Sequence, residues 1–317
     1  MPARRPPAAK QRAQRALATT NGVPAVERLG VRKTYKLYIG GAFPRTESGR
    51  AYEIVGARGE ALANACRGTR KDIRDAVRAA RKALPDWASK TAYNRSQILY
   101  RIAELMEGRR DQFIGEVMAA EGVGRQRATR LVNAAIDRWV WYAGWADKYT
   151  QLMGTVNPVA GSYFNFSVPE PTGVVGVIAP EGSSLLGLVS RLAPVVVSGN
   201  CAVVLASESR PLPAVTLTEV LATSDVPGGV VNLITGLRRE LVTHLAGHMD
   251  VNALDAYGLD PALATAVEET AAENVKRLVR PPAGGADAVD WLSPEAQSPY
   301  LIGEFTETKT VWHPIGG

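Results

Sequence analysis

The side chains that could act as nucleophiles are few in this sequence, and their positions predict little chemistry. The chain has two cysteines, Cys66 and Cys201. Cys201 begins an apolar run that is typical of a buried strand, where a thiol packs as a small hydrophobic side chain. A nucleophilic thiol needs a lowered pKa and an accessible cleft, and nothing near either cysteine indicates them. We therefore expect no catalytic cysteine.

Two histidines share a spacing that metal sites use. His244 and His248 are four residues apart, which places them on one face of a helix. A zinc site needs three or four ligands, and the sequence offers no convincing third ligand. The chain also contains no Gly-x-Gly-x-x-Gly phosphate-binding motif. We expect no metal site.

Three short apolar runs predict the element that would position functional side chains. They cover residues 173–178, 202–206 and 230–234, are rich in valine, and are bounded by glycine or proline. They are too short for helices, and segments of helical length separate them. Strands that do not alternate with polar residues are typical of a parallel sheet covered on both faces. The sequence therefore predicts an α/β fold with right-handed crossovers.

The same stretch carries the motifs of a known family. From Pro169 it reads Pro-Glu-Pro-Thr-Gly-Val-Val-Gly-Val-Ile-Ala-Pro, from Ser198 Ser-Gly-Asn-Cys-Ala-Val-Val-Leu-Ala, and from Asp225 Asp-Val-Pro-Gly-Gly-Val-Val-Asn-Leu-Ile-Thr-Gly. Their order and spacing over more than 60 residues resemble the cofactor-binding domain of the aldehyde dehydrogenases. The resemblance implies a Rossmann-like sheet at residues 170–280, after an N-terminal helical region at residues 34–150.

That helical region has its own signals. Apolar residues recur at helical spacing in residues 72–84 and 94–107, and residues 125–149 carry a cluster of tryptophan and tyrosine. The cluster could stack on bases, but aromatic residues at helical spacing favour a core or a subunit interface. Gly40-Gly41 between apolar residues predicts a tight hairpin turn.

The resemblance also indicates which positions would form the cofactor cleft, and several of them differ from the family. The family's oxyanion-stabilising asparagine corresponds to Gly182, and Glu181 places a carboxylate beside it. The family's ribose-binding lysine corresponds to Ala206, and either Glu208 or Ser209 corresponds to its ribose-binding glutamate. The altered cleft consists of Pro180, Glu181, Gly182, Ala206, Glu208, Gly236 and Gly258.

The helix start that would hold a pyrophosphate has changed as well. The family has Gly-Ser-Thr there, whereas residues 257–261 read Tyr-Gly-Leu-Asp-Pro. Pro261 has no backbone N–H, and Asp260 can cap the helix with its own carboxylate. The family's glutamate base has no counterpart in residues 280–285. The resemblance therefore implies no catalytic residue, and either no cofactor or weakly bound NAD.

Two segments far apart in the sequence predict a separate ribbon. Residues 156–168 alternate around a break near residues 158–162, and residues 306–312 form an alternating β-rich run. In the family these segments join in an arm that adds to a neighbouring subunit's sheet. We assign residues 151–169 and 300–315 to this oligomerisation arm. Its predicted interface residues are Val156, Phe164, Phe166, Phe305, Thr308, Thr310, Val311 and Trp312.

The arm leads to the main functional hypothesis. Residues 281–299 form a linker where the family has its whole catalytic domain, so this chain does not supply the sheet edge that its arm needs. We expect a non-catalytic subunit that joins a full-length active aldehyde dehydrogenase in a hetero-oligomer and stabilises or regulates it. An alternative is an NAD-binding subunit that contributes to an aldehyde oxidoreductase in trans.

Charge and composition indicate whether the chain binds nucleic acid, where it is located and whether it enters a membrane. Residues 1–33 hold eight Lys or Arg against Glu27 alone, and the rest of the chain holds 29 basic and 30 acidic residues. The composition predicts a disordered basic tail, and nucleic-acid binding through it is the last alternative, which the neutral body disfavours. Two cysteines, no secretory signal and no long apolar run favour a cytoplasmic protein that does not enter a membrane.

Overall fold

The structure is a computed structural model that describes residues 30–316. A compact unit begins at Thr34. Of the predicted disordered basic tail, residues 1–29 lie outside the described residues, so that expectation stays a prediction.

A parallel sheet forms the core. In the described part of the chain its five strands are β6 (Val174–Ile178), β7 (Cys201–Leu205), β8 (Val231–Ile234), β9 (Ala253–Asp255) and β10 (Arg277–Val279). Every residue of the first four is buried. This burial explains why the strands read as apolar runs without alternation, and it confirms the predicted α/β class.

The strand order indicates where a ligand-binding crevice would lie. The order is β10-β9-β6-β7-β8, and each neighbouring pair is parallel. The chain therefore builds the sheet outward from β6 to β8, then returns to the other side of β6 with β9. In doubly wound sheets ligands bind outside the carboxyl ends of the strands at this reversal.

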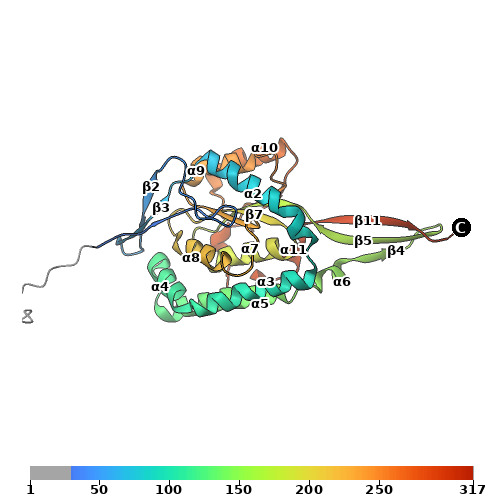
Figure 1. The fold of residues 1–317 in the computed structure, drawn as a ribbon, viewed down its shortest axis with the longest axis horizontal. Helices are drawn as coiled ribbons and strands as arrows, with labels where there is room; N and C mark the ends of the chain where they lie inside the picture. Colours follow the sequence, from blue (N-terminus) through green and yellow to red (C-terminus); the bar gives the residue numbers. More distant parts are fainter. Residues whose placement is uncertain (1–29, 317) are drawn as a thin grey trace, which may run out of the picture. The chain divides into compact units, whose positions relative to one another are not determined.

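Helices cover both faces of the sheet (Figure 1). On one face lie α2 (Arg70–Ser89), α9 (Arg238–Ala246) and α10 (Pro261–Ala272). On the other lie α7 (Leu186–Val197) and α8 (Leu212–Leu221). All twelve residues of α7 are buried, which is the pattern of a helix enclosed on all sides.

A second layer packs outside α7 and α8. It consists of α3 (Ala92–Gly108), α4 (Arg110–Glu121) and α5 (Arg125–Ala143). The predicted helix over residues 125–149 is wrong at its end, because α5 stops before Gly144 and a separate short helix, α6 (Tyr149–Met153), follows. Glycine is a poor helix former, and the chain tightens into turns there.

Helix α2 is longer than its pattern predicts. The periodicity indicated residues 72–84, and Pro85 reads as a stop, but the helix continues through Pro85 to Ser89. Trp87 supplies the reason: its side chain is fully buried and its indole N–H donates to the Val196 carbonyl at 3.1 Å. Packing against α7 outweighs the cost of an interior proline.

The region of residues 34–150 is not purely helical, which corrects the sequence assignment. Before α2 the described residues contain a small sheet of order β1-β3-β2, formed by β1 (Thr34–Tyr35), β2 (Ala51–Val55) and β3 (Ala61–Cys66). The sequence signal was weak because β3 is rich in alanine, which has low strand propensity. The turn at Gly40-Gly41 is confirmed, since both glycines have positive φ and Ile39 and Ala42 exchange two hydrogen bonds.

A three-stranded ribbon extends away from the α/β body (Figure 1). Its order is β11-β5-β4, from β4 (Thr155–Asn157), β5 (Tyr163–Pro171) and β11 (Thr306–Pro314), and it is antiparallel. The full length of β11 pairs with β5, which confirms the predicted joining of the two distant segments. Because β5 is in the middle, β4 and β11 form the ribbon's two edges.

The segment between β10 and β11 is short and packed. It contains two single 3₁₀ turns, η1 (Ala286–Ala288) and η2 (Pro294–Ala296), and the helix α11 (Tyr300–Gly303). Its backbone carbonyls at Trp291 and Ser298 accept hydrogen bonds from Arg138 and Tyr142 of α5. The predicted linker is therefore held against the second helical layer.

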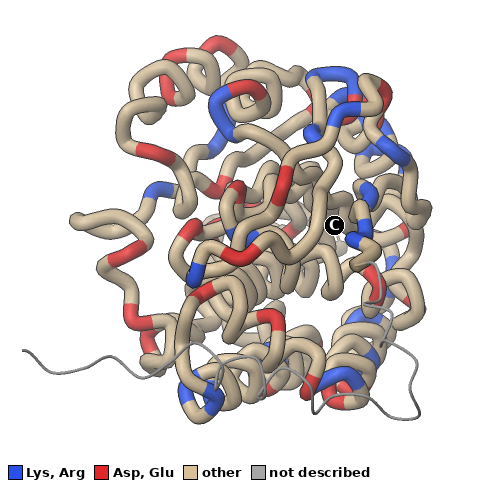
Figure 2. The backbone as a smooth tube through the Cα atoms, turned by 90° about the vertical axis from the view of Figure 1, so that its left-hand side faces the viewer, with Lys and Arg blue, Asp and Glu red and all other residues tan. Residues whose placement is uncertain are grey.

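Charged side chains are mixed over the described elements. Figure 2 shows Lys and Arg positions next to Asp and Glu positions on several of them, and ion pairs such as Arg109–Glu219 and Lys309–Glu170 join opposite signs. None of the described helices is both long and apolar enough to cross a membrane.

Candidate functional site

The candidate site is the crevice at the carboxyl ends of the central strands. It has a volume of about 490 Å³ and lies among the loops that follow β6, β7 and β9. The structure brings together Glu181, Glu208 and Gly258 in its lining, together with Asp260 and Arg238. These residues come from segments far apart in the sequence, so only the fold places them next to one another.

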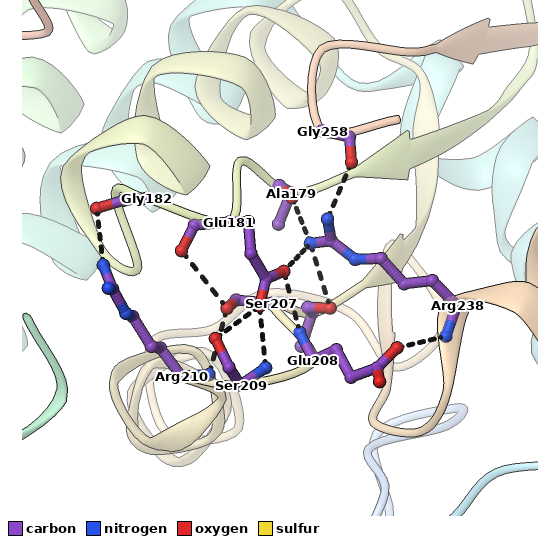
Figure 3. A network of polar contacts seen from close by, with 10 residues as sticks. Ala179, Glu181, Gly182, Ser207, Glu208, Ser209, Arg210, Arg238 and Gly258 are labelled. Atoms are coloured by element: carbon purple, nitrogen blue, oxygen red, sulfur yellow. Dashed lines mark hydrogen bonds and ion pairs between the residues drawn. The ribbon is translucent and has the colours of Figure 1, made fainter. Parts of the chain in front are cut away.

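Arg238 closes the inner end of this crevice. Its guanidinium donates from Nη1 to the Gly258 carbonyl at 2.7 Å, and from Nη2 to the carbonyls of Ala179 and Ala206 (Figure 3). Three carbonyl groups near the ends of three neighbouring strands thus bind one cation. The residue is only 9% exposed, and this burial lowers the pKa of the guanidinium.

Sequence reasoning missed Arg238, although it placed the start of a helix there. The available signal was a pair of arginines in the first turn of α9, where the helix dipole disfavours positive charge. A cation in an unfavourable helical position indicates that a tertiary partner compensates it.

Glu181 is that partner. Its carboxylate lies 2.9 Å from Nη2 of Arg238 and accepts hydrogen bonds from the backbone N–H groups of Glu208 at 3.0 Å and Ser209 at 2.7 Å. The Ser209 hydroxyl donates a further bond at 2.5 Å. Burial alone raises the pKa of the Glu181 carboxyl, but Arg238 and these donors hold it below its ordinary value. The carboxylate is therefore charged and fully engaged.

Glu208 and Ala206 also accept hydrogen bonds from Arg238. The Glu208 carboxylate accepts the backbone N–H of Arg238 at 2.7 Å, which caps the start of α9. Ala206 is buried and directs its carbonyl toward the Arg238 guanidinium. Glu208 lines the crevice, whereas Ala206 is buried beneath it, and both residues make polar contacts with Arg238.

Two glycines of the predicted cleft are required for close backbone contact. A side chain at Gly258 would place its Cβ 2.0 Å from the Ala179 carbonyl oxygen, because the loop after β9 crosses the end of β6. A Cβ at Gly236 would lie 2.9 Å from the Gly68 nitrogen, at a positive φ of 151°. Their glycine identity therefore follows from chain packing without any ligand.

The remaining loop positions are also occupied by internal contacts. Asp260 accepts the Ala262 N–H at 2.9 Å and Pro261 is the first residue of α10, so the helix is capped by its own carboxylate as predicted. The Gly182 carbonyl accepts a bond from Arg210 at 3.1 Å. Pro180 is buried beside it.

A buried ionic cluster joins the crevice to the start of the ribbon. Arg191 on α7 binds Asp255 at the end of β9 and Glu304 before β11, each at 2.6 Å, and its guanidinium lies 3.8 Å from the Tyr257 ring centre. Burial lowers the pKa of the Arg191 guanidinium, but the two carboxylates raise it above its ordinary value. No pattern in the sequence indicated this cluster.

The thiols of this chain are inaccessible. Cys66 and Cys201 are both buried, and burial raises the pKa of Cys201 to about 12. A thiol with that pKa is protonated at neutral pH and is a poor nucleophile. Within residues 30–316, no group of three or more His, Cys, Asp or Glu side chains could hold a metal ion.

Seven of the eight predicted interface residues lie on the ribbon and are exposed or half-buried, and one lies in the core. Val156 and Trp312 are 68% and 58% exposed, Phe164, Thr308 and Thr310 are also exposed, and Phe166 and Val311 are half-buried. The assignment of Phe305 is wrong for this structure: it precedes β11 and is fully buried in the core, so no partner can reach its side chain. The others lie on the ribbon.

Comparison with known proteins shows the family to which the chain is similar. The sequence model described as the aldehyde dehydrogenase family matches residues 45–289. Aldehyde dehydrogenase family 2 member B4, a mitochondrial protein of Arabidopsis thaliana, is 32% identical over 223 residues, which cover 69% of this chain and 41% of that protein.

Two solved structures show the same fold. HpcC from Thermus thermophilus matches with a TM-score of 0.73 and 29% identity, over 77% of this chain and 47% of that one. The NAD+ complex of aldehyde dehydrogenase from Bacillus cereus matches with a TM-score of 0.72 and 26% identity, over 77% of this chain and 50% of that one. The chain spans about half the length of the relatives it matches. With the family model matching most of its length, the chain belongs to the aldehyde dehydrogenase family.

Proposed function

We propose that this chain is a non-catalytic member of the aldehyde dehydrogenase family that assembles with a full-length active aldehyde dehydrogenase and stabilises or regulates it. The observation that carries the proposal is the ribbon β4-β5-β11, which extends from the body with two strand edges unpaired among the described residues. Unpaired strand edges bind further strands readily.

The exposed side chains of the ribbon support a docking role. Trp312 and Tyr163 contact one another across β11 and β5, with ring centres 5.8 Å apart, and both remain exposed. On β5 itself, the exposed Phe164 packs on the half-buried Phe166, with ring centres 5.4 Å apart. Exposed aromatic pairs on a projecting ribbon are more typical of an interface than of a solvated surface.

The closed crevice supports the non-catalytic part of the proposal. The groups that would meet a cofactor or an aldehyde are engaged with one another through Arg238 and Glu181, and both thiols are buried. A reaction in this family's fold would need a nucleophile from another chain. A cytoplasmic location remains part of the same proposal.

The test is purification of the tagged full-length chain from its native source, followed by native mass spectrometry. We expect a complex that contains a full-length aldehyde dehydrogenase in a fixed ratio, and a faster loss of aldehyde oxidation on heating when this chain is removed from the complex. A monodisperse lone chain, with no aldehyde dehydrogenase in the eluate, would contradict the proposal.

A second candidate function is NAD binding in trans, as part of an oxidoreductase site completed by the partner. The similarity to the NAD+ complex of the Bacillus cereus enzyme favours it. Titration calorimetry of the isolated chain with NAD+ separates the two candidates. Micromolar affinity would support the second, and millimolar or weaker affinity would support a purely structural role.

A further inference from the structure

In the crevice, three hydrogen-bond donors and the guanidinium of Arg238 converge on one side-chain carboxylate. The backbone N–H groups of Glu208 and Ser209, the Ser209 hydroxyl and Nη2 of Arg238 surround the Glu181 carboxylate at 2.5–3.0 Å (Figure 3). Successive backbone N–H groups beside a guanidinium are a typical binding arrangement for an oxyanion.

We propose that this donor set is an oxyanion-binding site that the chain fills with its own Glu181 side chain. The ligand class is a small oxyanion, either a carboxylate or a phosphate. While Glu181 is in place, an external anion must displace it before it reaches the ends of β6, β7 and β9. The inference deepens the proposed function, because it explains how the crevice of a non-catalytic subunit stays closed.

Arg238 brings a buried positive charge to the site. The residue is only 9% exposed, and its Nε atom is buried with no hydrogen-bond partner among the described residues. The rest of the guanidinium binds carbonyl oxygens and Glu181. Among residues 30–316, the buried cation therefore keeps one donor without an acceptor.

Glu181 can leave the site without disturbing the core. Its side chain is 41% exposed, and it follows β6 on a loop that borders the crevice. Among the donors, Arg238 is buried and two are backbone N–H groups, so these stay in place when the carboxylate is removed, whereas the Ser209 hydroxyl is exposed. The buried guanidinium of Arg238 is costly to leave without its carboxylate, and this cost favours the uptake of an external anion.

The charge around the site limits which anion fits. Glu208, Asp260 and Asp287 also line the crevice, against Arg238 and Arg239. Further negative charge is disfavoured here, so a monoanion should bind better than a dianion of similar size. We expect acetate to bind the emptied site more tightly than inorganic phosphate at neutral pH.

Chemical rescue tests the inference. Glu181→Ala empties the site, and the melting temperature of this variant should rise with acetate concentration at constant ionic strength, whereas the wild-type value should not. The apparent affinity for acetate should increase by at least about tenfold over the wild type, the size expected for a charge-assisted hydrogen bond. Glu181→Gln should show no rescue, because the amide still fills the space.

Matched variants exclude a general salt effect. Glu104→Ala removes the same charge from an exposed ion pair on α3 and should show no rescue. Glu181→Ala combined with Arg238→Met should lose the rescue. If Glu181→Ala does not fold, Glu181→Ser carries the same measurement with an equally emptied site.

Three results would overturn the inference: acetate and phosphate leave the emptied variant unchanged, the wild type responds equally, or Glu104→Ala responds like the crevice variant. All of these measurements use the isolated full chain without a partner. Failure here therefore leaves the proposed assembly untouched, and failure of the assembly test leaves the oxyanion site untouched.

Discussion

Arg238 and Glu181 show how two side chains determine the state of the crevice. The Glu181 carboxylate compensates the charge of the buried Arg238 guanidinium. The guanidinium in turn donates hydrogen bonds to backbone carbonyls of the loops that follow the strands. The sequence identified Glu181 as a carboxylate placed where an oxyanion would form. It did not identify Arg238, because nothing in the spacing of the two residues indicates that they meet.

Removing the guanidinium tests its structural role. Arg238→Met leaves Glu181 without its cation and three carbonyls without a donor. Breaking a buried pair costs about 3–5 kcal/mol, and the 41% exposure of the Glu181 side chain reduces our expectation to about 2 kcal/mol in the free energy of unfolding. Urea denaturation of the wild type and the variant measures this loss in the free energy of unfolding.

The neighbouring arginine is the control for this prediction. Arg239 is exposed, and Arg239→Met should change the free energy of unfolding by less than about 0.5 kcal/mol. Equal effects of the two variants would show that Arg238 has no special role.

The pH dependence of stability provides a second test at this scale. The pKa of Glu181 is below its ordinary 4.5 in the folded chain, so its carboxylate stabilises the fold above that value, and the stabilisation disappears as the pH falls through the folded-state pKa. The stability difference between wild type and Glu181→Gln should therefore be constant from about pH 7 to pH 5 and shrink below about pH 4. A difference that persists unchanged in acid would contradict the assignment.

At the scale of elements, the Arg191 cluster joins parts that the sequence separates. Arg191 of α7 binds β9 through Asp255 and the segment before β11 through Glu304. Arg277, the first residue of β10, donates to the carbonyls of Glu304 and Thr306. The base of the ribbon is therefore fixed to the sheet by two arginines.

The cost of losing this cluster should be large. Arg191→Met leaves two carboxylates without their cation, one of them fully buried, and we expect a loss of about 3–5 kcal/mol in the free energy of unfolding by urea denaturation. Arg101→Met, which removes an exposed arginine of α3, should cost less than about 1 kcal/mol. A small effect of Arg191→Met would mean that the pair contributes little net stability.

Local signals predicted some elements well and others poorly. The valine-rich runs predicted β6, β7 and β8, because strands buried on both faces are apolar along their whole length and are easily recognised in the sequence. The extension of α2 past Pro85 was missed because packing against α7 decided it, and the end of α5 was missed although Gly144 marks it. The β1-β3-β2 sheet was missed because β1 has only two residues and β3 is rich in alanine.

At the scale of the whole molecule, the ribbon is the surface on which the proposed assembly depends. Val156→Ser combined with Trp312→Ser removes two exposed apolar side chains from its opposite edge strands, β4 and β11. Because both side chains are exposed, the free energy of unfolding of the lone chain should change by less than about 0.5 kcal/mol. Association with the aldehyde dehydrogenase should weaken by about tenfold or more, measured by biolayer interferometry.

Tyr300→Ser is the matched control, because it removes an exposed aromatic side chain that lies on α11 and not on the ribbon. It should leave the association unchanged. If the control weakens binding as much as the ribbon variant, the interface lies elsewhere.

The sequence by itself determined the strands of the parallel sheet and the self-capped start of α10. Both depend on residue types within one segment, where burial and capping act over a few residues. The joining of the two ribbon segments was expected from the family resemblance. Only the tertiary structure decided that Arg238 closes the crevice on Glu181, that Arg191 holds the ribbon base, and that Phe305 belongs to the core. These contacts join residues from distant segments, and a distance in space between such residues is set by the packing of the whole fold.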